Sequence, residues 1–199
     1  MLLARKVMTE SVHVMLIGEG AEAFAREHDI AFEADEYFYT DYRWRQLQKA
    51  RSRDSARYAA ATPDTWLSTV GAVALDANGD LAAATSTGGT LGKLEGRVGD
   101  SPLIGPGTWA DDDIAISFTG TGEHIIRSGG AISIAHKVAA GMTVERAIDE
   151  VLAEIARLGG DAGVIVVTRD GKIAMDYNSD GMKRASVDSS SQVFATTFD

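Results

Sequence analysis

The sequence predicts an α+β fold built on an antiparallel sheet, and three observations support this prediction. Two stretches have the pattern of β-hairpins, one over residues 69–85 and the other over residues 164–176. A clearly amphipathic helix over residues 143–158 lies between them. Hairpins separated by helices are typical of α+β proteins, whereas a regular β-α-β-α alternation would indicate a parallel sheet.

The composition is that of a soluble globular protein with an acidic surface. The chain has 199 residues, of which 45% are hydrophobic and 24% charged, values typical of one domain or at most two. Its 19 basic and 29 acidic residues give a net charge of −10 at pH 7. A nucleic-acid-binding protein needs a basic surface for phosphates, so the charge argues against nucleic acid as a partner.

Cysteine content and hydropathy exclude further classes of protein. The chain contains no cysteine, which excludes disulfides, thiolate zinc sites and a cysteine nucleophile. No apolar run approaches the roughly 18 residues of a membrane-spanning helix. The N-terminal residues lack the apolar core of a secretory signal. We therefore expect a cytoplasmic protein without a membrane partner.

The N-terminal elements are short. Residues 1–11 predict a helix and residues 12–17 a strand, and Gly18-Glu19-Gly20 has the composition of a turn. Residues 21–27 predict a second helix, because their apolar side chains fall on one side. From residue 33 to residue 68, charged residues and tyrosines dominate. We interpret this segment as a mobile linker.

The remaining elements are more strongly patterned. Residues 46–58 of the linker have the pattern of a polar helix. Strands are predicted over residues 69–75 and 81–85 around the turn Asp76-Ala-Asn-Gly-Asp80, and over residues 114–118.

The last predicted elements are a helix and a hairpin. The helix over residues 143–158 has Thr143 as its N-cap and ends at Gly159-Gly160. The closing hairpin joins residues 164–168 to residues 172–176 through the turn Arg169-Asp170-Gly171.

Two familiar kinds of site are excluded by spacing. The stretch from Gly88 to Lys93 fails as a phosphate-binding loop, because Thr87 stands where its first glycine should be and Leu94 replaces the Ser or Thr after the lysine. The histidines do not have the spacing of metal ligands, and they are His13, His28, His124 and His136. We therefore predict no metal site.

Small hydroxyl residues and glycines gather where the predicted strands begin or end. Thr69 begins a strand, Thr85-Ser86-Thr87 ends its partner, and Thr119-Gly120 follows a third strand. Each is by itself a turn signal, but together they place hydroxyls and backbone amides where an oxyanion could be bound.

Arg97 and Asp100 lie three residues apart. Such a pair is either a surface ion pair or a pair of groups that binds both charges of one substrate.

Four motifs in order resemble the plant-type asparaginases, also called isoaspartyl peptidases, of the N-terminal-nucleophile hydrolases. These motifs are Thr69-Val-Gly-Ala-Val-Ala-Leu-Asp76, Leu81-Ala-Ala-Ala-Thr-Ser-Thr-Gly-Gly89, Gly96-Arg-Val-Gly-Asp-Ser-Pro-Leu-Ile-Gly105 and Thr119-Gly-Thr-Gly-Glu123. The segments over residues 4–21 and 178–184 are similar to the family as well. The resemblance covers nearly the whole chain.

The resemblance implies a nucleophile that is released by self-cleavage. Family precursors are cut immediately before a threonine, which here is Thr69, between it and Ser68. The family usually has Gly or Asp at the position of Ser68. The freed α-amino group of Thr69 would serve as the base for its own hydroxyl. Thr87 matches the threonine that orients the nucleophile.

The resemblance also implies the substrate contacts. Arg97 would bind the α-carboxylate of the substrate and Asp100 its α-ammonium group. Thr119 and the amide of Gly120 match the oxyanion hole, and the carbonyl of Gly122 faces the substrate amine. The implied substrates are L-asparagine and β-aspartyl dipeptides, from which aspartate is released.

The implied fold is the four-layer αββα sandwich of this family, truncated at the N-terminus. Residues 1–68 would be an α-subunit remnant whose linker spans residues 33–68, and residues 69–199 the β subunit of the same single domain. Family members pair as homodimers of αβ protomers. The family's sodium loop is absent from this sequence, so we expect no cofactor.

Three interpretations remain open from the sequence. The first is a hydrolase whose missing N-terminal part is truncated here or replaced structurally. The second is a relative that folds but neither cleaves itself nor turns over substrate. The third is a scaffold or dimer module that keeps the fold without its chemistry. The complete set of expected catalytic and substrate-binding residues favours the first.

Overall fold

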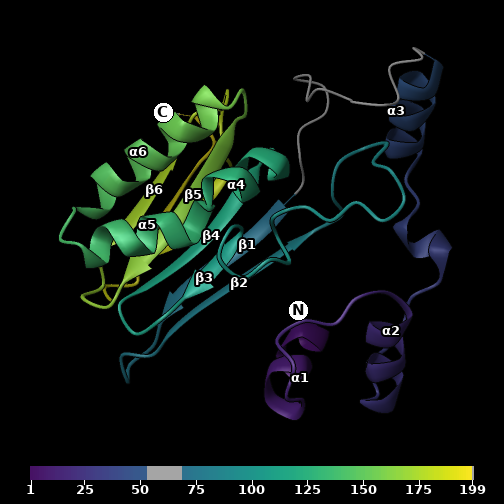
Figure 1. Cartoon of the computed structure of the whole chain (residues 1–199), viewed down its shortest axis with the longest axis horizontal. Coiled ribbons are helices and arrows are strands. Elements are labelled where there is room, and N and C mark those ends of the chain that lie inside the picture. The colour runs from purple at the N-terminus through teal and green to yellow at the C-terminus, as the bar shows by residue number, and fades with distance from the viewer. Residues whose placement is uncertain (53–68, 199) are drawn as a thin grey trace. The chain divides into compact units, whose positions relative to one another are not determined.

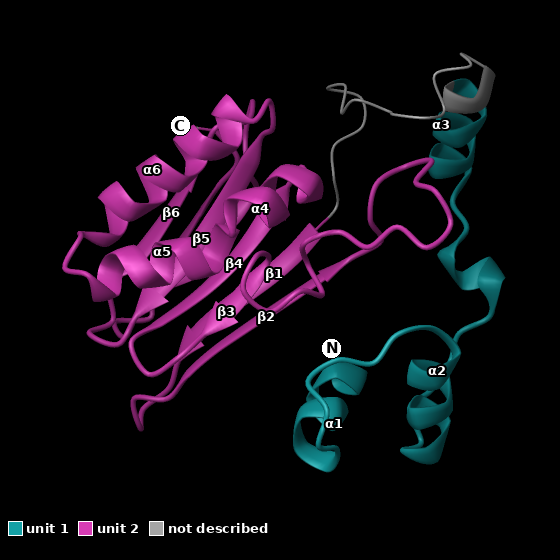
Figure 2. Ribbon diagram, in the orientation of Figure 1, with its two compact units in different colours: residues 1–56 teal, residues 57–199 magenta. Residues whose placement is uncertain are grey.

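The computed structural model describes residues 1–52 and 69–198, which belong to two compact units. The first unit covers Met1–Ala56 and the second covers Arg57–Asp199 (Figure 2). None of the helices in the described ranges has the length and apolar character needed to span a bilayer.

The first unit is helical. Its elements are α1 (Leu2–Glu10), α2 (Gly18–Glu27), the 3₁₀ turn η1 (Asp35–Phe38) and α3 (Asp41–Ser52) (Figure 1). The helices predicted over residues 1–11 and 21–27 are confirmed as α1 and α2.

Two predictions for the segment between these helices are wrong. Residues 12–17 form no strand, and the side chains of Val12 and Val14 are 93% and 81% exposed. A strand requires a partner for its backbone groups and an apolar surface to cover, and this segment has neither among the described residues. The predicted turn over residues 18–20 is instead the first turn of α2, where Glu19 is stabilised by the positive end of the helix dipole.

The segment interpreted as a linker contains regular structure. Within residues 33–68 lie η1 and α3, and α3 begins at Asp41 rather than at the predicted residue 46. Residues 53–58 of the predicted polar helix, like the rest of the segment up to Ser68, lie outside the described residues.

The second unit contains the predicted sheet. A hairpin forms from β1 (Thr69–Leu75) and β2 (Leu81–Thr87). Its strands are antiparallel and in full register, so that Thr69 pairs with Thr87. The turn between them is closed by Asp76, whose carboxylate accepts the backbone N–H groups of Asn78 and Asp80. The predicted hairpin is confirmed, with β2 two residues longer than expected.

A second, four-stranded sheet is antiparallel throughout. Its order is β3-β4-β5-β6, with β3 (Thr108–Ala110), β4 (Ile114–Gly120), β5 (Ala162–Thr168) and β6 (Ile173–Tyr177). The strands predicted over residues 114–118, 164–168 and 172–176 are confirmed as β4, β5 and β6. The α+β class is therefore confirmed.

Three helices cover one face of the four-stranded sheet (Figure 1). They are α4 (Gly122–Ser128), α5 (Gly130–Ala139) and α6 (Val144–Arg157). The helix α6 confirms the amphipathic pattern, and the Thr143 hydroxyl caps it by accepting the N–H of Arg146. Its buried face contacts β5 and β6 and shares one apolar core with alternate residues of β4, of which Ile114, Ile116 and Phe118 are at most 1% exposed.

The β1–β2 hairpin packs on the opposite face of this sheet, through contacts of β1 with β4 and β5 and of β2 with β3 and β4. A small hairpin, β7 (Arg184–Val187) and β8 (Val193–Thr196), follows at the C-terminus. The second unit thus has the layer order helix, sheet, sheet. The complete four-layer sandwich stays a prediction.

Close packing of the two sheets depends on a glycine. A Cβ atom on Gly71 of β1 would lie 3.0 Å from Cβ of Ser117 on β4 and closer still to its hydroxyl oxygen. We expect Gly71→Ala to lower the free energy of unfolding by about 1–3 kcal/mol, because the added methyl group overpacks this contact. Urea unfolding measures the change, and Ala72→Ser, on the exposed face of the same strand, serves as the control. A Gly71→Ala protein as stable as the wild type would contradict this account.

Candidate active site

A pair of threonine hydroxyls lies at the open end of the β1–β2 hairpin. Because Thr69 and Thr87 are directly paired, their side chains lie on the same face of the hairpin. The Thr69 hydroxyl donates to Oγ1 of Thr87 over 3.3 Å. Oγ1 of Thr87 also accepts the backbone N–H of Gly89 at 3.0 Å. Thr87 is thereby fixed in orientation and holds the hydroxyl of Thr69.

A second group of hydroxyls connects this hairpin to the four-stranded sheet. Oγ1 of Thr85 lies 2.7 Å from Oγ of Ser117, and the Thr108 hydroxyl donates to Thr85. Oγ1 of Thr108 also lies 3.3 Å from the carbonyl oxygen of Ser101. Ser101 directly follows Asp100, so these hydroxyls join the strands of the threonine pair to the loop that carries the acidic residue.

Arg97 is held by a partner that the sequence analysis did not identify. Its Nε and Nη2 atoms donate to the two carboxylate oxygens of Glu123 at 2.9 and 3.0 Å. The Arg97 side chain is only 17% exposed, and its guanidinium group holds the pKa of Glu123 below the usual range. The ion pair uses one edge of the guanidinium group and leaves the Nη1 amino group outside the pair.

Asp100 is a buried carboxylate with an unsatisfied oxygen. The residue is 5% exposed, and its Oδ2 atom has no hydrogen-bond partner among the described residues. Burial raises the pKa of Asp100 to about 6, although the nearby Arg97 acts in the opposite direction. A buried carboxylate without a full set of partners is suited to receive a cationic group.

Gly122 allows the two charged groups to approach the start of α4. A Cβ atom at this position would lie 2.8 Å from Oδ1 of Asp100 and 3.0 Å from Nη2 of Arg97. Any side chain would therefore displace one of the two charges. The structure brings Arg97, Asp100 and Gly122 into one cluster, as the resemblance implies.

Thr119 and Gly120 lie at the end of β4, directly before α4. Thr119 is on the same face of β4 as Ser117, which is the face that contacts the β1–β2 hairpin. Gly120 has φ +138° and its missing side chain would overlap the backbone of Asp161 and Ala162, so only glycine fits there. The end of β4 and the start of β1 lie at the same end of the two sheets (Figure 1).

Two of the residues that shape this region were not predicted. Glu123 stands inside a motif that was recognised, but nothing in the spacing indicated that it pairs with Arg97 rather than with solvent. Ser117 lies inside a predicted strand, and the signal that could have found it is a polar residue in an otherwise apolar central strand. Ser68, predicted to precede the cleaved bond, lies outside the described residues.

The cluster has the charges of an amino-acid site rather than a phosphate or metal site. Lys93, in the stretch first tested as a phosphate loop, donates to the carbonyl oxygen of Gly88. Within the described ranges, no three or more His, Asp or Glu side chains gather in a way that could hold a metal ion. A guanidinium group beside a buried carboxylate complements a molecule that carries both a carboxylate and an ammonium group.

Known proteins are similar to this chain over most of its length. A family model described as "Asparaginase" matches residues 1–195. The chain is 45% identical over 191 residues to the "Isoaspartyl peptidase" of Escherichia coli, covering 92% of this chain and 60% of the relative.

Two mammalian proteins are similar over the same region. The "Isoaspartyl peptidase/L-asparaginase" of Mus musculus is 40% identical over 187 residues, covering 93% of this chain and 57% of the relative. The human protein of that name is 39% identical over 182 residues, covering 90% of this chain and 58% of the relative. The chain thus spans about 60% of the length of the relatives it matches.

Proposed function

Since the chain belongs to the asparaginase family, we propose that it is a threonine hydrolase that releases aspartate from L-asparagine and from β-aspartyl dipeptides. The observation that carries this proposal is the buried Asp100 beside Arg97, at the same end of the sheets as the hydroxyl pair of Thr69 and Thr87. The names of the relatives support the same substrates.

The aspartyl part of the substrate is recognised by its two charges. Asp100 pairs with the α-ammonium group, and the carbonyl of Gly122 accepts a hydrogen bond from it. Arg97 binds the α-carboxylate with the amino group that its ion pair with Glu123 leaves available. L-asparagine and β-aspartyl dipeptides present the same head to these residues, so both fit one site.

The reaction forms and then hydrolyses an ester on Thr69. The Thr69 hydroxyl oxygen attacks the side-chain carbonyl carbon, and its proton passes to the α-amino group of the same residue. Thr119 and the Gly120 amide stabilise the negative charge that develops on the carbonyl oxygen. The proton then moves to the leaving ammonia or amino acid as the C–N bond breaks. Water attacks the ester, aspartate leaves and the hydroxyl is restored.

The nucleophile becomes available when the chain cleaves itself between Ser68 and Thr69. The Thr69 hydroxyl attacks the Ser68 carbonyl carbon, the acyl group moves from nitrogen to oxygen, and water hydrolyses the resulting ester. The products are an α subunit of residues 1–68 and a β subunit of residues 69–199, which pair as a homodimer of αβ protomers with the N-terminally truncated four-layer sandwich fold. No cofactor takes part in any of these steps.

Intact mass under denaturing conditions tests this function directly. The purified chain is followed over several days, and a species with the mass of residues 69–199 is expected to accumulate together with activity that releases aspartate from β-aspartyl dipeptides. A chain that keeps its full mass and releases no aspartate would overturn the proposal in favour of a scaffold that has kept the fold alone.

Arg97→Ala is expected to raise KM for both substrates by a factor of about 10 to 150, with a smaller change in kcat. The variant removes a charge-assisted contact to the α-carboxylate, worth about 1.5–3 kcal/mol. Steady-state kinetics on L-asparagine and a β-aspartyl dipeptide measure the effect, with Arg127→Ala, an exposed arginine on α4, as the control. An unchanged KM would remove Arg97 from the substrate site.

A further inference from the structure

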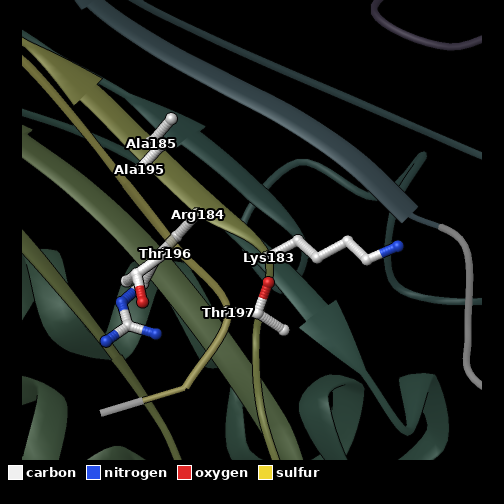
Figure 3. A pocket seen from close by; sticks show the side chains of 6 residues that line it. All are labelled: Lys183, Arg184, Ala185, Ala195, Thr196 and Thr197. Atoms are coloured by element: carbon white, nitrogen blue, oxygen red, sulfur yellow. The ribbon is translucent and has the colours of Figure 1, made fainter.

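One cationic pocket lies outside the cluster that recognises the aspartyl head. It is lined by residues at the ends of the β7–β8 hairpin, namely Lys183, Arg184, Ala185, Ala195, Thr196 and Thr197 (Figure 3). Arg184 is held in place, because its guanidinium group stacks 4.9 Å above the ring of Tyr177. Lys183 is exposed, and no carboxylate of the described residues forms an ion pair with it.

The register of the sheet connects the residues under the start of β7 with the reacting end of β4. Thr119 pairs with Gly163 of β5, which in turn pairs with Tyr177 of β6, so the three residues share one face. Met182 packs on that face, since its Cγ atom lies 3.3 Å from where a Cβ of Gly163 would be. Lys183 follows Met182 directly, and in Figure 3 its ammonium group extends toward the side of the view where β1 begins.

The aspartyl-binding loop lies on the other side of Thr119. Gly107 directly precedes β3, and its missing side chain would meet the Asp100 carbonyl carbon at 2.5 Å. The Asp100 loop is therefore attached at the β3 side of β4, whereas Met182 packs on Gly163 of β5 and Arg184 stacks on Tyr177 of β6. A substrate whose scissile carbonyl lies at Thr119 would have its head toward Asp100 and its leaving group toward Lys183.

The two substrate types differ in the leaving group that they place on the Lys183 side of Thr119. From L-asparagine the leaving group is ammonia, which carries no carboxylate. From a β-aspartyl dipeptide it is an α-amino acid, whose carboxylate needs a cation that Arg97 cannot supply while it binds the head. Two cations of the pocket lie on this side. Arg184 stacks on the ring of Tyr177, whereas the exposed Lys183 has a long side chain that suits a point-charge contact with a carboxylate.

Resting on the proposed function, we propose that Lys183 forms a leaving-group subsite that binds the C-terminal carboxylate of β-aspartyl dipeptides. Lys183 is thus a specificity-determining residue that favours dipeptides over L-asparagine. The adjacent hydroxyls of Thr196 and Thr197 line the same pocket.

A pair of substrates that differ only in this carboxylate tests the subsite. KM is measured for β-aspartyl-leucine and for β-aspartyl-leucinamide, with the wild-type chain, Lys183→Met and Lys183→Arg. Lys183→Met should raise KM for the acid about fivefold, the effect of one exposed ion pair, and leave KM for the amide and for L-asparagine unchanged. Lys183→Arg should retain most of the wild-type affinity for the acid, and added salt should raise the wild-type KM more for the acid than for the amide.

The same substitution at a distant lysine is the control. Lys172, which pairs with Glu145 at the far end of the β5–β6 hairpin, should tolerate Met without a change in either KM. If Lys183→Met changes KM for acid and amide equally, or changes neither, the subsite is wrong while the proposed function stands. If the wild-type chain hydrolyses none of the three substrates, the proposed function fails and the subsite with it.

Discussion

Replacing Thr69 by alanine is expected to abolish both self-cleavage and hydrolysis, with a loss of more than about 10³-fold in each rate. In the proposed mechanism the hydroxyl of Thr69 is the attacking atom in both reactions, and the methyl group of alanine cannot replace it. Thr87, its hydrogen-bond partner at 3.3 Å, lacks a free α-amino group to act as base. Intact mass should show only the full-length chain, and aspartate release should fall to the background rate.

Two further variants separate chemistry from structure. Thr69→Ser keeps the hydroxyl and should cleave itself and turn over substrate at reduced rates. Thr87→Val keeps the size of the partner but removes its oxygen, so Thr69 loses its orientation and both rates should fall while the fold is retained. Measurable aspartate release by Thr69→Ala would sink the assignment of Thr69 as nucleophile.

The elements that the sequence predicted well are those with a strong period and clear ends. The β1–β2 hairpin has two runs rich in small apolar residues on either side of an Asn-Gly turn, and α6 has both a capping threonine and a continuous apolar face. The strand predicted over residues 12–17 failed because β-branched residues only favour a strand where a partner strand exists.

Other elements were missed because their local signals are weak. The helices α4 and α5 meet at Gly129-Gly130, where both residues have positive φ. This break leaves two short helices, and neither is long enough for a clear periodic pattern of apolar residues. The strand β3 has three residues, too few for any period to be visible. The hairpin β7–β8 exposes Val187, Val193 and Phe194, so its pattern does not separate a buried face from a solvent face.

At the candidate site, the sequence predicted the residues but not which side chains pair with one another. Motifs indicated Arg97 and Asp100, and their spacing of three left open whether they form a surface ion pair or bind both charges of one substrate. In the structure, Arg97 forms an ion pair with Glu123. Asp100 is buried, and one of its carboxylate oxygens has no hydrogen-bond partner among the described residues. Sequence distance could not reveal this, because Glu123 reaches Arg97 only through the fold of β4 and the start of α4. Gly122 makes the arrangement possible because it has no side chain that would displace Asp100 or Arg97. This close approach is visible only in the three-dimensional structure.

The acid side of the pH profile should be governed by Asp100. Its pKa of about 6 in the folded protein means that the carboxylate is protonated at lower pH and no longer pairs with the α-ammonium group of the substrate. We expect kcat/KM to fall below about pH 6, and a profile that is flat from pH 5 to pH 8 would contradict the assignment. Asp112→Asn, an exposed carboxylate on a turn, should leave the profile unchanged.

Asp100→Asn should separate stability from activity. Burial raises the pKa of this carboxyl from 3.8 to about 6, so the folded state prefers the protonated form. The stabilising contribution of the raised pKa is complete below pH 3.8. It is lost as the pH rises through 6, where ionisation of the buried carboxyl lowers the free energy of unfolding by up to about 3 kcal/mol. Asparagine has the same shape without the charge. The variant should therefore be about 1–3 kcal/mol more stable than the wild type at pH 8 and nearly equal to it at pH 4, as measured by urea unfolding.

The same variant should lose substrate binding, because a neutral amide does not attract the α-ammonium group as a carboxylate does. We expect KM for L-asparagine and β-aspartyl dipeptides to rise at least about tenfold. A gain in stability at pH 8 together with this loss would show that the buried charge is retained for the substrate at a cost to the fold. A variant less stable than the wild type at pH 8 would mean that Asp100 is satisfied by partners within the protein, and its role in recognition would have to be given up.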